Sequence, residues 1–160
     1  MRVIPLISIR FVNSTCTFYF QYKLLAMKTL KTIFLPIVLS ALWISISEFV
    51  RNEILLKSFW LEHYQSLGLV FPSEPVNGAI WGVWSLALAT SIYIISRRFS
   101  LWPAIFITWF MAFVLMWLVI GNMDVLPLGL LWVALPLSIL EVTVAAIIIR
   151  ALADGQPVAI

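Results

Sequence analysis

Charged residues are scarce in this chain: Asp, Glu, Lys and Arg make up 11% of its 160 residues, against about 25% in soluble domains. It contains one cysteine, Cys16, and one histidine, His63. A single cysteine excludes an intrachain disulfide, and a single histidine excludes bis-histidine haem ligation and an HExxH zinc site. We therefore expect no metal site and no cofactor. Since the Ser and carboxyl residues are scattered along the chain, we also expect that the protein is not an enzyme.

Apolar sequence, by contrast, is abundant. Hydrophobic residues make up 63% of the chain, and its mean hydropathy is +1.08. A helix that crosses a bilayer needs about 20 mostly apolar residues. Four stretches of that length follow one another, at about 30–50, 76–96, 101–121 and 128–149. The sequence therefore predicts an all-α polytopic membrane protein, a four-transmembrane-helix bundle. It forms one membrane domain, 28–151, followed by a short cytoplasmic tail, 152–160.

Residues 1–27 form an N-terminal arm that does not fit this pattern. Its longest uncharged run, 11–22, is too short to span a bilayer, and the arm has no small-residue cleavage site of a signal peptide. From Met27, a short basic segment leads into the first apolar stretch, as at a natural start. Two interpretations stay open: translation begins at Met27 and the assigned start is wrong, or the arm is amphipathic and lies on the membrane surface.

Basic residues mark one side of the four predicted spans. Five of them share that side: Lys28, Lys31, Arg97, Arg98 and Arg150. The loop after the first span, on the other side, holds Arg51 and Lys57. Because Lys and Arg favour the cytoplasmic side of short loops, we expect a multi-pass protein of the plasma (inner) membrane with both termini in the cytoplasm. The net charge of +3 therefore indicates orientation, and we expect no nucleic-acid partner.

The loop after the first span has the pattern of an amphipathic outer helix. Over 48–67, apolar and aromatic residues fall on one helical face and polar residues on the other, and Gly68 is placed to end the helix. Trp60 and Tyr64 suit the headgroup region of a membrane. One interpretation is a structural helix at the interface, and the other is a lid over an outward-facing pocket.

Glu141 is a carboxyl group near the middle of the fourth predicted span. A charged side chain at that depth costs about 2.5–3.5 kcal/mol on insertion scales, so it faces the bundle interior and not lipid. Small and polar residues at i, i+4, i+7 and i+11 support an interior face: Ala134, Ser138, Glu141 and Ala145. The second span repeats that spacing, beginning with a GxxxG sequence: Gly78, Gly82, Ser85 and Ala89.

GxxxG sequences let helices approach closely, so we expect the second and fourth spans to pack along these two stripes. The packing would place Glu141 near Thr90, and Pro136 should kink the fourth span one turn before Glu141. The candidate intramembrane polar site consists of Glu141, Ser138, Thr90 and Ser85. Two interpretations stay open: Glu141 is a protonated side chain that joins helices by hydrogen bonds, or it marks a proton, ion or substrate site.

A second polar group lies at the predicted outer end of the first span. Its members are Glu48, Arg51, Asn52 and, from the tight turn between the third and fourth spans, Asp124. The simple interpretation is an ion pair between Glu48 and Arg51 at the membrane boundary. The sharper one is an outer vestibule that also includes Asp124.

The segments 48–60 and 136–141 resemble those of small bacterial four-span membrane-protein families of unknown function. This resemblance implies the same four-span architecture and no particular activity. In size the chain is also similar to small multidrug transporters. Their essential glutamate lies in the first span, however, whereas the mid-membrane glutamate here lies in the last one, so we do not transfer their function.

Together these observations favour an integral membrane protein that is a structural or accessory subunit. Its partners would be the lipid bilayer and either further copies of itself, as a homo-oligomer, or a larger membrane protein. The alternative is a small proton-coupled transporter or channel in which Glu141 is the titrating group.

Overall fold

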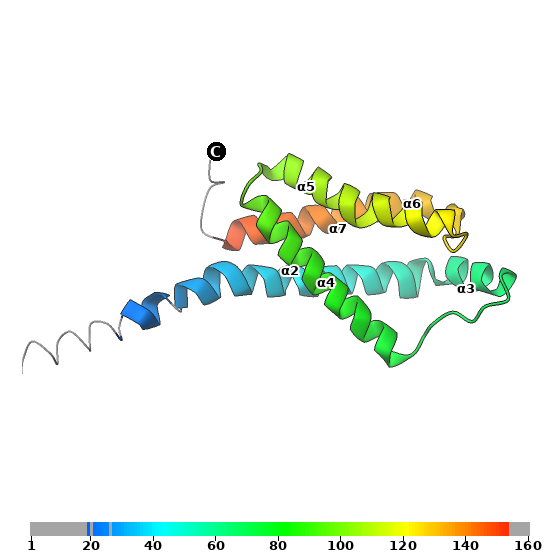
Figure 1. Ribbon diagram of the computed structural model, residues 1–160, viewed down its shortest axis with the longest axis horizontal. Helices are drawn as coiled ribbons and strands as arrows, with labels where there is room; N and C mark the ends of the chain where they lie inside the picture. Colours follow the sequence, from blue (N-terminus) through cyan, green and yellow to red (C-terminus); the bar gives the residue numbers. More distant parts are fainter. Residues whose placement is uncertain (1–18, 20, 26, 154–160) are drawn as a thin grey trace, which may run out of the picture.

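The computed structural model describes residues 19, 21–25 and 27–153, and all regular elements among them are helices (Figure 1). Among these described residues, four helices are long and apolar enough to cross a membrane: Gln21–Leu55, Pro75–Ser96, Leu101–Asn122 and Leu128–Leu152. The predicted all-α class and the four long apolar helices are confirmed. Most of the arm 1–27, to which the two interpretations apply, lies outside the described residues. The same holds for most of the tail 152–160.

The first span consists of η1 (Leu30–Phe34), α2 (Leu35–Phe49) and η2 (Val50–Leu55), where η1 and η2 are π-helical turns. Pro36 cannot donate a backbone hydrogen bond and crowds the turn before it, and the wide turn of η1 relieves that crowding. At the other end, the N–H of Leu56 donates to the carbonyl of Arg51 over 2.9 Å. The helix thus continues five residues beyond the predicted end at residue 50.

A short helix, α3 (Lys57–Ser66), follows the first span where the amphipathic pattern predicts one. It begins after Leu56, whose backbone leaves the helical region, and the chain turns away at Gly68 with φ +70°. An apolar cluster beneath α3 joins it to the turn between the last two spans: Leu56, Leu126, Leu130 and Ala134, with Trp60 packed against them. In addition, the His63 ring nitrogen Nε2 lies 2.8 Å from the carbonyl oxygen of Asp124.

The other three spans are built from α4 (Pro75–Ser96), then α5 (Leu101–Trp109), η3 (Phe110–Val114) and α6 (Leu115–Asn122), and finally η4 (Leu128–Leu130) and α7 (Leu131–Leu152). The main core forms where α2, α4, α7 and the third span meet, and it includes Ile44, Ile92, Phe113, Val142 and Ala145. Pro136 lies inside α7, which continues through it.

The small-residue stripe on α7 is buried along its whole length, from Ala134 to Ala145. The stripe on α4 is buried at Ser85 and Ala89, whereas Gly78 and Gly82 are exposed. A Cβ atom added at either glycine would meet nothing within 4 Å in the described part of the chain. The predicted close approach at this GxxxG sequence is therefore wrong. The reason is the oblique path of α4, whose N-terminal half leans away from the other spans (Figure 1).

The two ends of the bundle differ in charge. The end with the α4–α5 turn and the C-terminus of α7, here named the basic end, holds the five basic residues that the sequence placed on one side (Figure 1). There the Arg150 guanidinium donates to the carbonyl of Phe99. The opposite end, the α3 end, holds Lys57, while Arg51 lies buried within the bundle. Which end faces the cytoplasm stays a prediction.

Candidate functional site

Three ionisable side chains meet inside the bundle, here named the triad: Glu48 and Arg51 of the first span and Glu141 of α7. Their exposed fractions are 4%, 4% and 0%, respectively. The guanidinium of Arg51 donates through Nη2 to Oε1 of Glu48 and through Nη1 to Oε2 of Glu141, the latter over 3.2 Å. The hydroxyl of Ser47 donates to the same Oε2 over 2.9 Å. The two polar groups that the sequence placed in separate sites are thus joined by Arg51.

The small residues of α7 explain how the first span comes this close. Next to Ala145, the Ser40 hydroxyl reaches the backbone and donates to the Ala145 carbonyl over 3.2 Å. The indole N–H of Trp43 donates to the carbonyl of Glu141 over 3.0 Å. These contacts set the antiparallel register of the first span against α7. In this register Ser47, Glu48 and Arg51 lie beside the Glu141 side chain.

The triad lies at the middle depth of the spans. Glu141 is central in the 22-residue helix α7, about 15 Å from either end at 1.5 Å per residue, in a hydrocarbon layer about 30 Å thick. The guanidinium carbon of Arg51 lies 5.0 Å from the ring centre of Phe113, near the middle of the third span. The Phe113 ring in turn packs edge-on against Trp84, 5.8 Å away on α4. The sequence placed Arg51 at the membrane boundary, whereas its side chain points back toward the helix N-terminus and reaches Glu141.

Hydrogen bonds extend the triad toward α3. The Asn52 amide donates to Oε2 of Glu48 over 2.6 Å, and the indole N–H of Trp60 on α3 donates to Oδ1 of Asn52 over 3.2 Å. These residues form a continuous chain, here named the polar column: Trp60, Asn52, Glu48, Arg51 and Glu141. It leads from the α3 end to the centre of the bundle.

Glu141 has one oxygen that the column does not satisfy. Its Oε1 atom is fully buried and has no hydrogen-bond donor among the described residues. In a low-dielectric interior an unpaired polar atom is costly, and an unpaired charge far more so. Two carboxyl groups also share the single guanidinium of Arg51, so the triad cannot be neutral if both are ionised.

Several residues of the two predicted sites have hydrogen-bond partners outside the triad or lie at the surface. Thr90 and Ser85 donate to carbonyls of their own helix, those of Leu86 and Trp81. Ser138 is buried one turn from Glu141, where it accepts a 2.9 Å hydrogen bond from the indole of Trp109. Asp124 is exposed at the α6–α7 turn, where its backbone has φ +58°. The structure thus joins Glu141, Glu48, Arg51 and Asn52 by hydrogen bonds. The grouping of Thr90 and Ser85 with Glu141 stays a prediction.

Sequence reasoning missed three aromatic contributors to the site: Trp43, Trp109 and Phe113. The indole N–H groups of Trp43 and Trp109 each donate a hydrogen bond to α7. An available signal was the polar face of the first span, on which Ser40, Ser47 and Glu48 follow at helical spacing.

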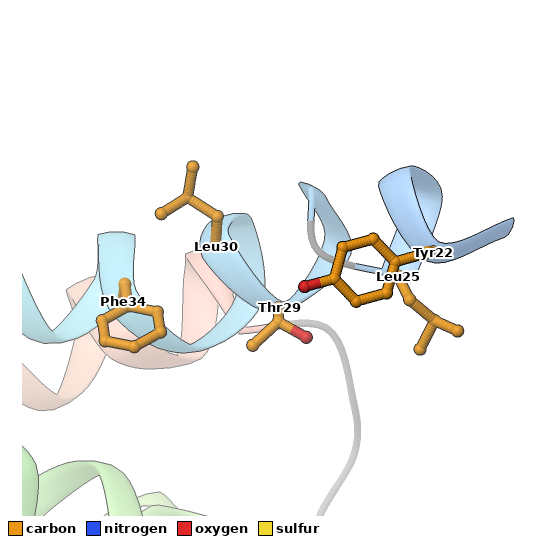
Figure 2. A pocket seen from close by; sticks show the side chains of 5 residues that line it. All are labelled: Tyr22, Leu25, Thr29, Leu30 and Phe34. Carbon is orange, nitrogen blue, oxygen red and sulfur yellow. The ribbon is translucent and has the colours of Figure 1, made fainter. Parts of the chain in front are cut away.

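Other sites receive little support from the described residues, which contain no group of three or more His, Cys, Asp or Glu able to hold a metal ion. Figure 2 shows a hollow near the start of the first span. Its lining comes from a single helical stretch: Tyr22, Leu25, Thr29, Leu30 and Phe34. Since no second span closes it, the hollow is a surface feature rather than a binding site.

Comparisons with protein-family models, with curated proteins and with solved structures find no match to this chain. The resemblance of 48–60 and 136–141 to small bacterial four-span families is therefore not confirmed. Function has to be inferred from the chemistry of the polar column.

Proposed function

We propose that this protein is a non-enzymatic integral membrane protein that serves as a structural or accessory subunit, in which polar side-chain contacts lock the first span to α7. Four polar contacts between these spans support the proposal, and three of them end on Glu141. Water does not compete for such hydrogen bonds inside a membrane, so they hold two spans in one register.

The seclusion of the charged groups argues against catalysis. A catalytic group must reach its substrate, whereas Glu48, Arg51 and Glu141 are each at most 4% exposed. Hydroxyl groups elsewhere in the spans, such as those of Thr90 and Thr143, donate to carbonyls of their own helices. The charged groups are enclosed between the spans, and the spans are held in one register. Both features suit a subunit that supports other membrane proteins.

The outer surface of the spans suits burial in a membrane. Large apolar side chains are exposed on all four spans, including Ile46, Val83, Met111 and Trp132. Lipid covers such a surface, and so does a membrane partner. We place the protein in the plasma (inner) membrane with the basic end in the cytoplasm, because five basic residues gather there. The partner is either a second copy of this chain or a larger membrane protein.

A second function is favoured by one observation. Oε1 of Glu141 is unpartnered in the described structure, and the polar column connects it to the α3 end. These are features of a proton-coupled transporter or channel. Against it, the parts of the spans between Glu141 and the basic end contain no further Asp, Glu or His. A proton relay of carboxyl groups would therefore stop halfway across.

Proton flux into liposomes separates the two functions. The purified protein is reconstituted, a pH gradient is imposed, and the interior pH is followed with a trapped dye. If the protein is a structural or accessory subunit, we expect the wild type and Glu141→Gln to give the same proton flux as protein-free vesicles. A transporter or channel predicts a flux in the wild type that Glu141→Gln abolishes and that Glu74→Gln, an exposed control, retains.

If the protein is a subunit, it should also be part of a larger complex in its native membrane. After mild solubilisation of native membranes, the protein should migrate in a complex larger than its own 18.2 kDa. A monomer in those extracts, together with a proton flux in liposomes, would replace the first function with the second.

A further inference from the structure

The charge of the triad has to balance within the bundle. Of the Asp and Glu residues that the structure describes, Glu48 and Glu141 are buried and the other four are at least partly exposed. The spans Pro75–Ser96 and Leu101–Asn122 contain no Asp, Glu, Lys, Arg, Cys or His, and Tyr93 is their single titratable side chain. On α7, Arg150 is bonded to the Phe99 carbonyl at the basic end. Arg51 is thus the one buried cation that faces two buried carboxyl groups in the described bundle.

An uncompensated charge at this depth is expensive, because little solvent or protein polarity stabilises it. With both carboxyl groups ionised, the triad would have a net charge of −1. One bound proton removes that charge, so the arrangement favours a triad that contains one ionised carboxylate, one guanidinium and one carboxylic acid.

The hydrogen bonds indicate which carboxyl group holds the proton. Both oxygens of Glu48 accept, Oε1 from Arg51 and Oε2 from Asn52, as expected for a carboxylate. In Glu141, Oε2 accepts from Ser47 and Arg51, whereas Oε1 has no donor in the described structure. The carboxyl groups of Glu48 and Glu141 are also close enough to share a hydrogen bond once one of them is protonated.

We infer that the triad is a binding site for one proton, which Oε1 of Glu141 holds next to the Glu48–Arg51 ion pair. The protonated oxygen becomes a hydrogen-bond donor, so the one unsatisfied atom of the cluster can be paired with Glu48. This site goes beyond the proposed function and would exist in a static subunit as well as in a transporter.

Access to the site lies on the side of α3. Asn52 and Trp60, which complete the polar column there, are both partly exposed. Val142 and Ala145, which follow Glu141 toward the basic end, have exposed fractions of 0%. The proton therefore exchanges with water through Glu48 and the α3 end.

Infrared spectroscopy of the protein in lipid nanodiscs tests the site directly. A protonated carboxyl group gives a C=O stretching band apart from those of carboxylates, and the band shifts when its proton is replaced by deuterium. At neutral pH we expect the wild type to show this band. Glu141→Gln should lose the band, while Glu74→Gln, which removes an exposed carboxyl group, should keep it.

Glu48→Gln distinguishes charge balance from burial. In this variant Arg51 has one carboxyl partner left, so Glu141 should ionise and the band should disappear. A band that persists in Glu48→Gln would show that burial alone protonates Glu141 and would overturn the shared site. Absence of the band from the wild type would also overturn it. If Glu141→Gln does not fold, the spectra of the wild type and of Glu48→Gln still test the proton site. Their outcome does not depend on the result of the flux measurement.

Discussion

Two ion pairs in one stretch of chain have opposite surroundings. Glu48 and Arg51 are spaced i,i+3 and their side chains are each 5% exposed, whereas Glu53 and Lys57 are spaced i,i+4 and are 35% and 42% exposed. In the sequence both pairs look like helix-surface pairs. In the structure Arg51 has a second carboxyl partner on α7, while Lys57 lies near the α3 end. A partner on a distant span, rather than local spacing, decides which pair is buried.

The difference in burial implies a difference in energy. Removing one partner of a buried pair leaves an uncompensated charge, which costs about 3–5 kcal/mol. An exposed pair at i,i+4 stabilises a helix by about 0.3–0.5 kcal/mol, because water and salt already screen the charges. The two pairs should therefore respond very differently to the same kind of substitution.

The largest effect is expected for Arg51→Leu. The substitution leaves Glu48 and Glu141 facing one another without their cation, and we expect unfolding free energy to fall by about 3–5 kcal/mol. Titration with SDS in mixed micelles, followed by circular dichroism, measures the loss. A loss no larger than that of Lys57→Gln would show that the triad does not depend on its positive charge.

The double variant Glu48→Gln, Arg51→Leu should be more stable than Arg51→Leu alone. It removes both charges of the ion pair and leaves Glu141 as a neutral acid, so no uncompensated charge remains. We expect a coupling energy between the two substitutions of about 0.5–3 kcal/mol, the range for residues in contact. The same SDS titration on wild type, both single variants and the double variant completes the cycle. Additive losses would mean that Glu48 and Arg51 act independently.

A smaller effect is expected for Trp60→Phe. Phenylalanine keeps an aromatic ring at this position of α3 but cannot donate to Oδ1 of Asn52. The loss of one hydrogen bond should cost roughly 1 kcal/mol, and hydrogen exchange in α3 should become faster. The matched control is Trp132→Phe, since Trp132 is 86% exposed on α7. If Trp60→Phe and Trp132→Phe caused equal losses of stability, the hydrogen bond between Trp60 and Asn52 would not help to hold α3 to the bundle.

Much of the fold follows from local properties of the sequence. Apolar length predicts four spans, the amphipathic pattern predicts a helix at α3, and Gly68 does end that segment with a positive φ. The end of the first span was less predictable. Because the first apolar stretch ends at about residue 50, the sequence predicts Arg51 at the boundary, whereas Glu141 and Ser47 hold that region inside the bundle.

The candidate site shows where the pattern stops being informative. The stripes on α4 and α7 have equal spacing, yet Gly82 is exposed while Ala134 and Ala145 are buried. Spacing identifies a face that permits close approach, but the crossing angle decides where the approach takes place. The choice of partner for Glu141 follows from charge: a cation on the first span stabilises a buried carboxyl group more than small residues on α4 can.

The smallest effect is expected for Lys57→Gln, which breaks the exposed pair with Glu53. We expect a loss of at most about 0.5 kcal/mol in low salt, and less in high salt, because screening weakens exposed pairs. The buried pair should behave differently, since salt cannot enter its apolar surroundings: the loss caused by Arg51→Leu should be nearly the same at both salt concentrations. SDS titrations of the two variants in low and high salt test this contrast. If the Arg51→Leu loss fell with salt as steeply as that of Lys57→Gln, ions would have access to Arg51, and the apolar surroundings would not shield the buried pair from salt.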